Sequence, residues 1–265
     1  MRNLLSTGLS ILFIVTSLLA GGCASEGESR KQLESGYAAL DAKNYDAAMT
    51  AADEHLHRAS GGPGSAEALY LRGRALEQRQ ASSPQQSRAD WQAARAAYTE
   101  ALNQRPAPKL EAHVRAGLAN VAYFQDDYVT AMREWGLTYE KLDDPEAKAW
   151  VLYRLGLCHQ RMGSFAEADK VFGQVQHEYP NTVPAQRAQE HQGARAFTVQ
   201  LATYANRGTA DAALAALRRE GVTPTATIDP QGRSIVRVGP MSNYQQALAL
   251  KQRYADRYPD ALILP

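Results

Sequence analysis

Residues 152–180 read LYRLGLCHQRMGSFAEADKVFGQVQHEYP. Small residues stand at Gly156 and Ala168, where two antiparallel helices would cross, and two phenylalanines have the spacing to fill the groove between the helices. Pro180 ends the second helix because proline cannot continue the hydrogen-bond ladder. The stretch therefore predicts one pair of packed helices. The pattern positions are Leu152, Leu155, Gly156, Gly163, Phe165, Ala168, Phe172 and Pro180.

The same pattern recurs upstream. Its matching positions are Gly36, Leu40, Tyr45, Ala48 and Ala52 in the first copy, Leu69, Gly73, Leu76, Trp91, Ala94, Tyr98, Ala101 and Pro106 in the second, and Leu118, Ala119, Tyr128, Ala131 and Trp135 in the third. The predicted helix pairs span residues 30–58, 65–106, 110–142 and 146–180, with a Gln/Ser-rich loop at 78–88 and a closing helix at 184–191. Because one pair cannot bury its apolar face alone, neighbouring pairs are expected to stack.

Residues 32–193 resemble the tetratricopeptide family, strongly in the last copy and loosely in the first. The resemblance implies an α-solenoid whose concave groove holds a protein or peptide partner. The aromatic residues at the repeat positions are then core side chains and not a ligand box. Trp150 falls outside the repeat register, and we expect it to be half exposed and available to a partner.

The periodicity changes after residue 196. Residues 197–204 alternate and are rich in β-branched and aromatic residues, which is typical of a strand. The segment after this strand returns to helical spacing and ends at Gly221. The predicted elements, in the order βαββαβ, are strands at 197–204, 223–228, 233–238 and 261–264 and helices at 206–220 and 242–258.

Three segments of residues 196–265 resemble the SPOR (sporulation-related) domain. They are VQLATY at 199–204, GVT at 221–223 and VRVGPM at 236–241. The resemblance implies a domain that binds the glycan strands of peptidoglycan, with a preference for denuded strands, from which the stem peptides have been removed. Such strands occur where amidases cut, chiefly at division sites. The glycan-binding residues expected from the family pattern and from the strand face are Gln200, Thr203, Tyr204, Arg233, Ile235 and Arg237.

Strand alternation separates two faces of the predicted sheet. Gln200 and Ala202 share one face of the first strand. Arg233, Ile235 and Arg237 share one face of the third strand, and we expect both sets to point outward. Arg233 stands where the family often has an aromatic residue, Ile235 stands where it often has an arginine, and Ala202 replaces a usual glycine. Arg237 is expected to supply the guanidinium that Ile235 lacks.

The first 22 residues have the layout of a secretory signal peptide, with one basic residue, an apolar run and small residues before Cys23. The segment AGGC at 20–23 resembles a bacterial lipobox, which implies cleavage before Cys23 and attachment of palmitate-type acyl chains there. Ala24, in place of aspartate, implies transfer to the outer membrane, facing the periplasm. Residues 23–31 are then a short lipidated tether. An ordinary signal peptide with a chance cysteine is the alternative.

The remaining sequence indicates a binding protein and not an enzyme. The formal net charge is +1 and no Lys/Arg-rich run is present, which argues against a nucleic-acid partner. The six histidines have no spacing that suits a zinc site, and no nucleophile elbow, phosphate loop or dinucleotide motif is found. No catalytic residue, metal or cofactor is therefore expected. Cys158 is expected to be a small buried hydrophobe.

The sequence thus predicts a two-domain protein of α + α/β class, with an α-solenoid at 32–193 and a small βαββαβ domain at 196–265. The expected function is an envelope tether in cell division or wall remodelling, in which the lipid holds the membrane, the repeats recruit a protein and the C-terminal sheet binds glycan. One alternative is a repeat scaffold for envelope assembly that binds no glycan. Another is an accessory protein that activates a wall hydrolase without catalysing anything.

Overall fold

The computed structural model describes residues 20–58 and 61–265. The chain forms two compact units that divide after Val121. Most of the predicted signal peptide, residues 1–19, lies outside the described residues, and the side chain of Cys23 is not described either. In the described part of the chain, no helix combines the length and the apolar character that crossing a membrane requires.

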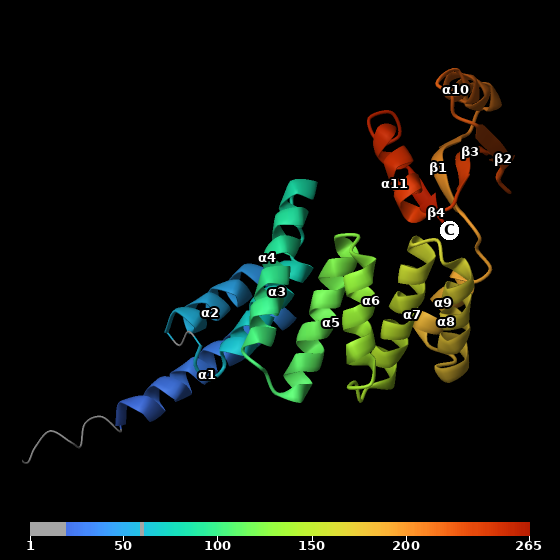
Figure 1. Ribbon diagram of the computed structural model, residues 1–265. Helices are drawn as coiled ribbons and strands as arrows, with labels where there is room; N and C mark the ends of the chain where they lie inside the picture. The colour runs from blue at the N-terminus through green and yellow to red at the C-terminus, as the bar shows by residue number, and fades with distance from the viewer. Residues whose placement is uncertain (1–19, 59–60) are drawn as a thin grey trace, which may run out of the picture. The chain divides into compact units, whose positions relative to one another are not determined.

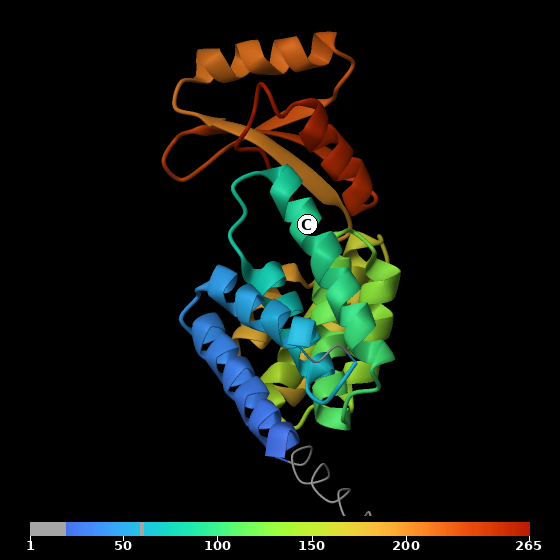
Figure 2. The same cartoon turned by 90° about the vertical axis from the view of Figure 1, so that its left-hand side faces the viewer.

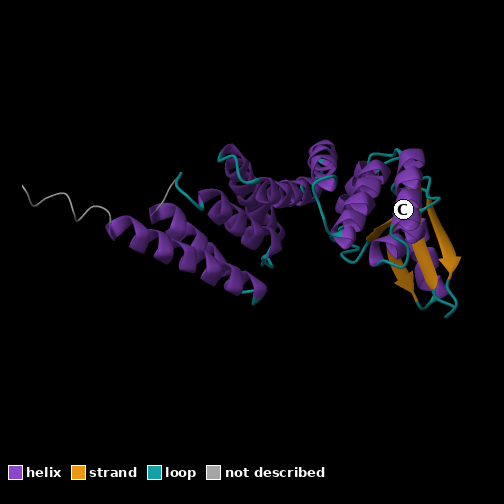
Figure 3. Ribbon diagram, turned by 90° about the horizontal axis from the view of Figure 1, so that it is seen from below, coloured by secondary structure: helices purple, strands orange, loops and turns teal. Residues whose placement is uncertain are grey.

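The described chain before residue 197 is helical, and strands are confined to its C-terminal part (Figure 3). The helices, labelled in Figure 1, are α1 (Ala20–Asp41), α2 (Tyr45–Arg58), α3 (Ser65–Gln78), α4 (Pro84–Asn103), α5 (Pro108–Phe124), α6 (Tyr128–Tyr139), α7 (Pro145–Arg161), α8 (Phe165–Glu178) and α9 (Val183–His191). Helices α1 and α2, α3 and α4, and α7 and α8 pack as pairs. Each helix of the four predicted pairs, and the closing helix, has a counterpart among these helices.

Large rings in the repeats rest on glycines, as the sequence pattern predicts. In the first unit, the Tyr98 ring lies against both Gly73 and Gly117, where a Cβ atom would collide with it. In the second unit, the Phe172 ring occupies the same kind of space beside Gly156. Both rings are fully buried. The small residues of the repeat are therefore required by helix approach.

Helix α1 begins earlier than the sequence analysis implies. The predicted tether at residues 23–31 lies within α1, which runs beside α2 as Figure 2 shows. An ion pair one helical turn apart, Arg30 to Glu34 at 3.3 Å, supports this part of α1. Gln32 donates a hydrogen bond to Glu54 of α2, and Leu33 is buried in the first pair. These contacts favour a helix over an extended segment.

The predicted loop at 78–88 is also shorter, because α4 already begins at Pro84. Ser83 caps this helix, since its hydroxyl accepts a hydrogen bond from the Gln86 backbone N–H at 3.1 Å. Proline is well tolerated at the first helical position, where its missing N–H has no intrahelical partner. The Ser-Pro dipeptide was thus a helix start and not a loop signal.

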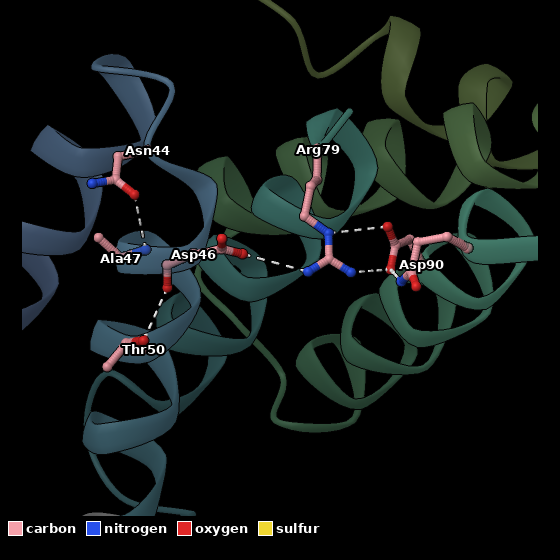
Figure 4. A network of polar contacts seen from close by, with 7 residues as sticks. Asn44, Asp46, Ala47, Thr50, Arg79 and Asp90 are labelled. Carbon is pink, nitrogen blue, oxygen red and sulfur yellow. Dashed lines mark hydrogen bonds and ion pairs between the residues drawn. The ribbon is translucent and has the colours of Figure 1, made fainter. Parts of the chain in front are cut away.

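A buried ion pair holds the loop between α3 and α4 (Figure 4). The Arg79 guanidinium donates two hydrogen bonds to the Asp90 carboxylate, which also accepts one from Gln86 at 2.7 Å. A third donor of Arg79 reaches Asp46 of α2 at 3.4 Å. Because the Asp90 side chain is 5% exposed, removing its cation would leave a buried charge unpaired.

The C-terminal elements follow the predicted order βαββαβ. They are β1 (Phe197–Tyr204), α10 (Arg207–Arg219), β2 (Pro224–Ile228), β3 (Ser234–Met241), α11 (Tyr244–Arg253) and β4 (Leu262–Leu264). The strands form one antiparallel sheet in the order β2-β3-β1-β4. Together with the helical region, this sheet confirms the predicted fold class.

Both C-terminal helices pack on the same face of the sheet, which we call the core face. Val199 and Val236 are fully buried there against Leu217 of α10. Ala247 and Tyr254 bring α11 into the same apolar core. The core therefore lies on one side of the strands, and the side chains of the other face are left partly accessible.

Candidate functional site

The accessible face of the C-terminal sheet, here called the open face, is set by strand register. Residues that pair across antiparallel strands point to the same side. Gln200 pairs with Arg237 and Leu262, and Arg237 also pairs with Thr225. Thr203 and Thr227 both pair with Ile235. The open-face residues are thus Thr198, Gln200, Thr203, Thr225, Thr227, Ile235, Arg237, Leu262 and Leu264.

An irregularity in β1 changes which residues reach this face. Gln200 pairs with Arg237 but Ala202 pairs with Val236, so β1 holds one extra residue near Leu201. As a result, Ala202 packs on the core face with Val236, and not beside Gln200 as simple alternation predicts. Thr203 is carried to the open face instead.

Gln200 and Arg237 form the polar centre of the open face. Arg237 donates from Nη2 to the Gln200 Oε1 atom at 3.4 Å, and Gln200 Nε2 lies 3.5 Å from the Thr203 hydroxyl. The buried Nε of Arg237 has no hydrogen-bond partner among the described residues. The site is therefore a cation beside an amide and a hydroxyl, and these groups are suited to a ligand rich in oxygen atoms.

Aliphatic side chains flank this polar centre. Ile235 lies between Thr203 and Thr227 in the register, and Leu262 is 52% exposed next to Gln200. The open face can thus offer hydrogen-bond donors and apolar surface to the same ligand.

Two predicted site residues, Tyr204 and Arg233, lie apart from this centre. Tyr204 pairs with the buried Ser234 and packs against the apolar core. Arg233 precedes β3, and its Nε donates to the Asp229 carboxylate at 2.7 Å in the turn after β2. Burial opposes ionisation of Asp229, but hydrogen bonds from Arg233 outweigh it and lower the pKa of the carboxyl group. Arg233 therefore stabilises the turn between β2 and β3.

The structure brings together Gln200, Thr203, Ile235 and Arg237 on the open face. It adds residues that the sequence analysis missed, namely Thr225, Thr227 and Leu262. The alternation of Leu262 with Ile263 was visible in the sequence. Placing Leu262 beside Gln200, however, requires the strand order, because β4 and β1 are distant in sequence and pair across the sheet.

In the repeats, Trp150 is half buried, as expected. Its ring lies 5.3 Å from the Arg187 guanidinium and 5.9 Å from that of Arg154. Cys158 is buried, and burial raises the pKa of its thiol to about 12, so it is a protonated, inert side chain at neutral pH. The described residues contain no group of three or more His, Cys, Asp or Glu side chains arranged to hold a metal ion.

Comparison with known families agrees with both parts of this architecture. Residues 150–182 match the family model of the tetratricopeptide repeat, and residues 193–265 match that of the SPOR domain. No curated protein matches the chain. Neither matched family is a family of enzymes. The chain therefore carries a tetratricopeptide repeat, which indicates a protein partner, and a SPOR domain, which indicates peptidoglycan binding in the bacterial cell envelope.

Proposed function

We propose that the open face of the SPOR domain binds glycan strands of peptidoglycan, with a preference for denuded strands. The observation that carries this proposal is the Gln200–Arg237 pair at the centre of a sheet face that α10 and α11 leave uncovered. Sugar hydroxyls accept from amide and guanidinium N–H groups and donate to the amide oxygen. The apolar faces of sugar rings can pack on Ile235 and Leu262, which removes apolar surface from water.

Arg237 supplies a reason for the preference for denuded strands. Each muramic acid carries a lactyl group whose carboxyl is amide-linked to the stem peptide. Amidases cut that amide and leave a free carboxylate. Arg237 is the cation at the polar centre, and a charge-assisted hydrogen bond to a carboxylate is about twice as strong as one to a neutral acceptor. The denuded strand therefore offers a group that the intact strand lacks.

The proposed role of the whole protein is a tether between membrane and wall. Acyl chains on Cys23 would hold the chain in the outer membrane, since two or more chains anchor a protein stably. The repeats would hold a protein partner, and the SPOR domain would hold the wall. Denuded strands form where the wall is being cut, so the tether would act in division or wall remodelling.

Sedimentation with isolated wall sacculi tests the glycan proposal. The purified full chain is expected to pellet with sacculi, and more of it after the sacculi have been treated with an amidase. A Gln245→Ala variant is the matched control, because Gln245 is an exposed glutamine on α11 and not on the sheet. Protein that stays in the supernatant with both kinds of sacculi contradicts the proposal.

Metabolic labelling with palmitate tests the anchor. The label is expected on the wild type and on a Cys158→Ala variant, and it is expected to be lost from a Cys23→Ala variant. The two cysteines of the sequence serve as each other's controls. Label that survives Cys23→Ala removes the lipid anchor from the proposal.

A scaffold that binds no glycan is the second candidate, and Ile235 favours it. Ile235 stands where the family pattern often has an arginine. Arg237 of β3 must then supply the positive charge of the site. In that case, neither kind of sacculus retains the protein, while the repeats still bind their partner.

A further inference from the structure

Arg161, the last residue of α7, lies between two tyrosine rings. Its guanidinium carbon is 4.3 Å from the centre of the Tyr123 ring at the end of α5 and 4.2 Å from that of Tyr244 at the start of α11. Its Nη1 also donates to the Tyr128 hydroxyl at 3.3 Å. A planar guanidinium stacks on such rings in a way that a lysine does not reproduce. This stack joins the repeat helices to the SPOR domain.

Phe165 makes a second connection. The sequence pattern predicts that it fills the groove between α7 and α8, but in the structure it belongs to the core of the SPOR domain. Its ring centre lies 5.7 Å from that of Phe197 in β1, and Phe197 meets Tyr244 at the same distance. With 8% of its surface exposed, Phe165 is a core side chain that the repeat contributes to its neighbour.

The segment that links the repeats to the SPOR domain is bonded to α8. The Asp169 carboxylate of α8 accepts a hydrogen bond from the Gly193 N–H at 2.8 Å and pairs with Arg195 at 2.7 Å. At the turn between α7 and α8, Gly163 has a φ of +84°, and the Ser242 carbonyl would lie 2.7 Å from a Cβ atom there. The backbone before α11 therefore approaches this turn as closely as a glycine allows.

From these contacts we propose that α7 and α8 are a docking platform for the chain's own SPOR domain, so that repeat and sheet move as one rigid body. The contacts use the start of β1, the start of α11 and the linker. Gln200 and Arg237 are not among them, so docking leaves the polar centre of the open face available. A partner held by the last repeat would thus keep a fixed orientation relative to whatever the sheet binds. This inference does not depend on the identity of that ligand.

Backbone ¹⁵N relaxation of the full chain tests the proposal directly. Amides of α8 and of β1 and β3 are expected to report the same rotational correlation time. A shorter correlation time for the sheet than for α8 would mean that the SPOR domain turns independently, and the proposal would be wrong. The measurement needs no variant.

Hydrogen exchange then identifies the residues that hold the SPOR domain on α7 and α8. Phe165→Ala is expected to accelerate exchange of the β1 amides on the order of 100-fold, because it removes a core side chain of the SPOR domain. Arg161→Lys should accelerate the same amides by about threefold to tenfold. Met162→Ala is the control, since Met162 is exposed beside Arg161 and should change nothing. Faster exchange in α8 with unchanged exchange in β1 would confine Phe165 to the repeat and contradict docking.

Discussion

The two faces of the C-terminal sheet are built from the same strands but differ in burial and in polarity. On the core face, Val199, Val236 and Leu217 are sealed from water. On the open face, Gln200 and Arg237 keep hydrogen-bonding groups that the fold does not use fully. The core face determines whether the domain folds, and we propose that the open face determines what it binds. Substitutions should therefore separate stability from binding.

The largest expected effect is on the core face. Leu217→Ala removes a fully buried side chain of α10 and should lower the free energy of unfolding of the SPOR domain by about 2–5 kcal/mol. Urea unfolding followed by the NMR signals of the β1 and β3 amides would measure it. A loss under about 1 kcal/mol would mean that this face is less tightly packed than the structure indicates.

The next largest effect is on the open face. Arg237→Gln should weaken sedimentation with amidase-treated sacculi about tenfold, because it removes a charge-assisted hydrogen bond. The melting temperature should stay close to that of the wild type, and the gain in binding produced by amidase treatment should disappear. If binding falls equally on treated and untreated sacculi, Arg237 does not recognise the carboxylate.

Gln200→Ala should have a smaller effect of the same kind. Loss of a neutral hydrogen-bonding amide is expected to weaken sedimentation about threefold to fivefold without destabilising the domain. The Gln245→Ala variant should behave as the wild type. Equal binding by the wild type and both variants would place the binding surface elsewhere on the domain.

The smallest effect concerns pH. The pKa of Asp229 is lower in the folded state than its ordinary value of 3.8, so its contribution to stability is present above that value. As the pH falls below about 4, the carboxylate takes up a proton and the contribution is lost. The melting temperature of the wild type should therefore fall slightly more in acid than that of Asp229→Asn. Identical pH profiles would show that the turn adds nothing to stability.

The elements of this fold were largely predictable, because each one has a local signal. Helix spacing, the small residues at Gly156 and Ala168, and the β-branched alternation of β1 are all visible without the structure. Ser83 and Pro84 were visible too, as a cap and a first helical residue, although the sequence analysis assigned them to a loop. Helix α1, in contrast, covers residues 23–31, where a tether was expected, and one ion pair, Arg30 to Glu34, lies along it.

The candidate site was less predictable, because pairing between distant segments decides it. The extra residue near Leu201 is visible only in the register of β1 against β3, and it moves Ala202 to the core face and Thr203 to the open face. Leu262 joins the site because β4 adds to β1. Phe165 fits its own repeat by spacing but packs in the next domain. Local periodicity carries no information about such contacts.

The Arg79 cluster has a consequence for dividing or recombining this chain. An exposed loop such as residues 79–83 would ordinarily tolerate a break or an inserted sequence. Here, however, the loop begins with Arg79, the cation that pairs with Asp90. A cut after Arg79 would put the buried carboxylate and its counter-charge on separate fragments. Fragments split at this loop should recover their fold only when mixed. A repeat array shortened by removing α3, the loop and α4 together would remove both partners of that ion pair, leave no buried charge behind and lose only the exposed link to Asp46.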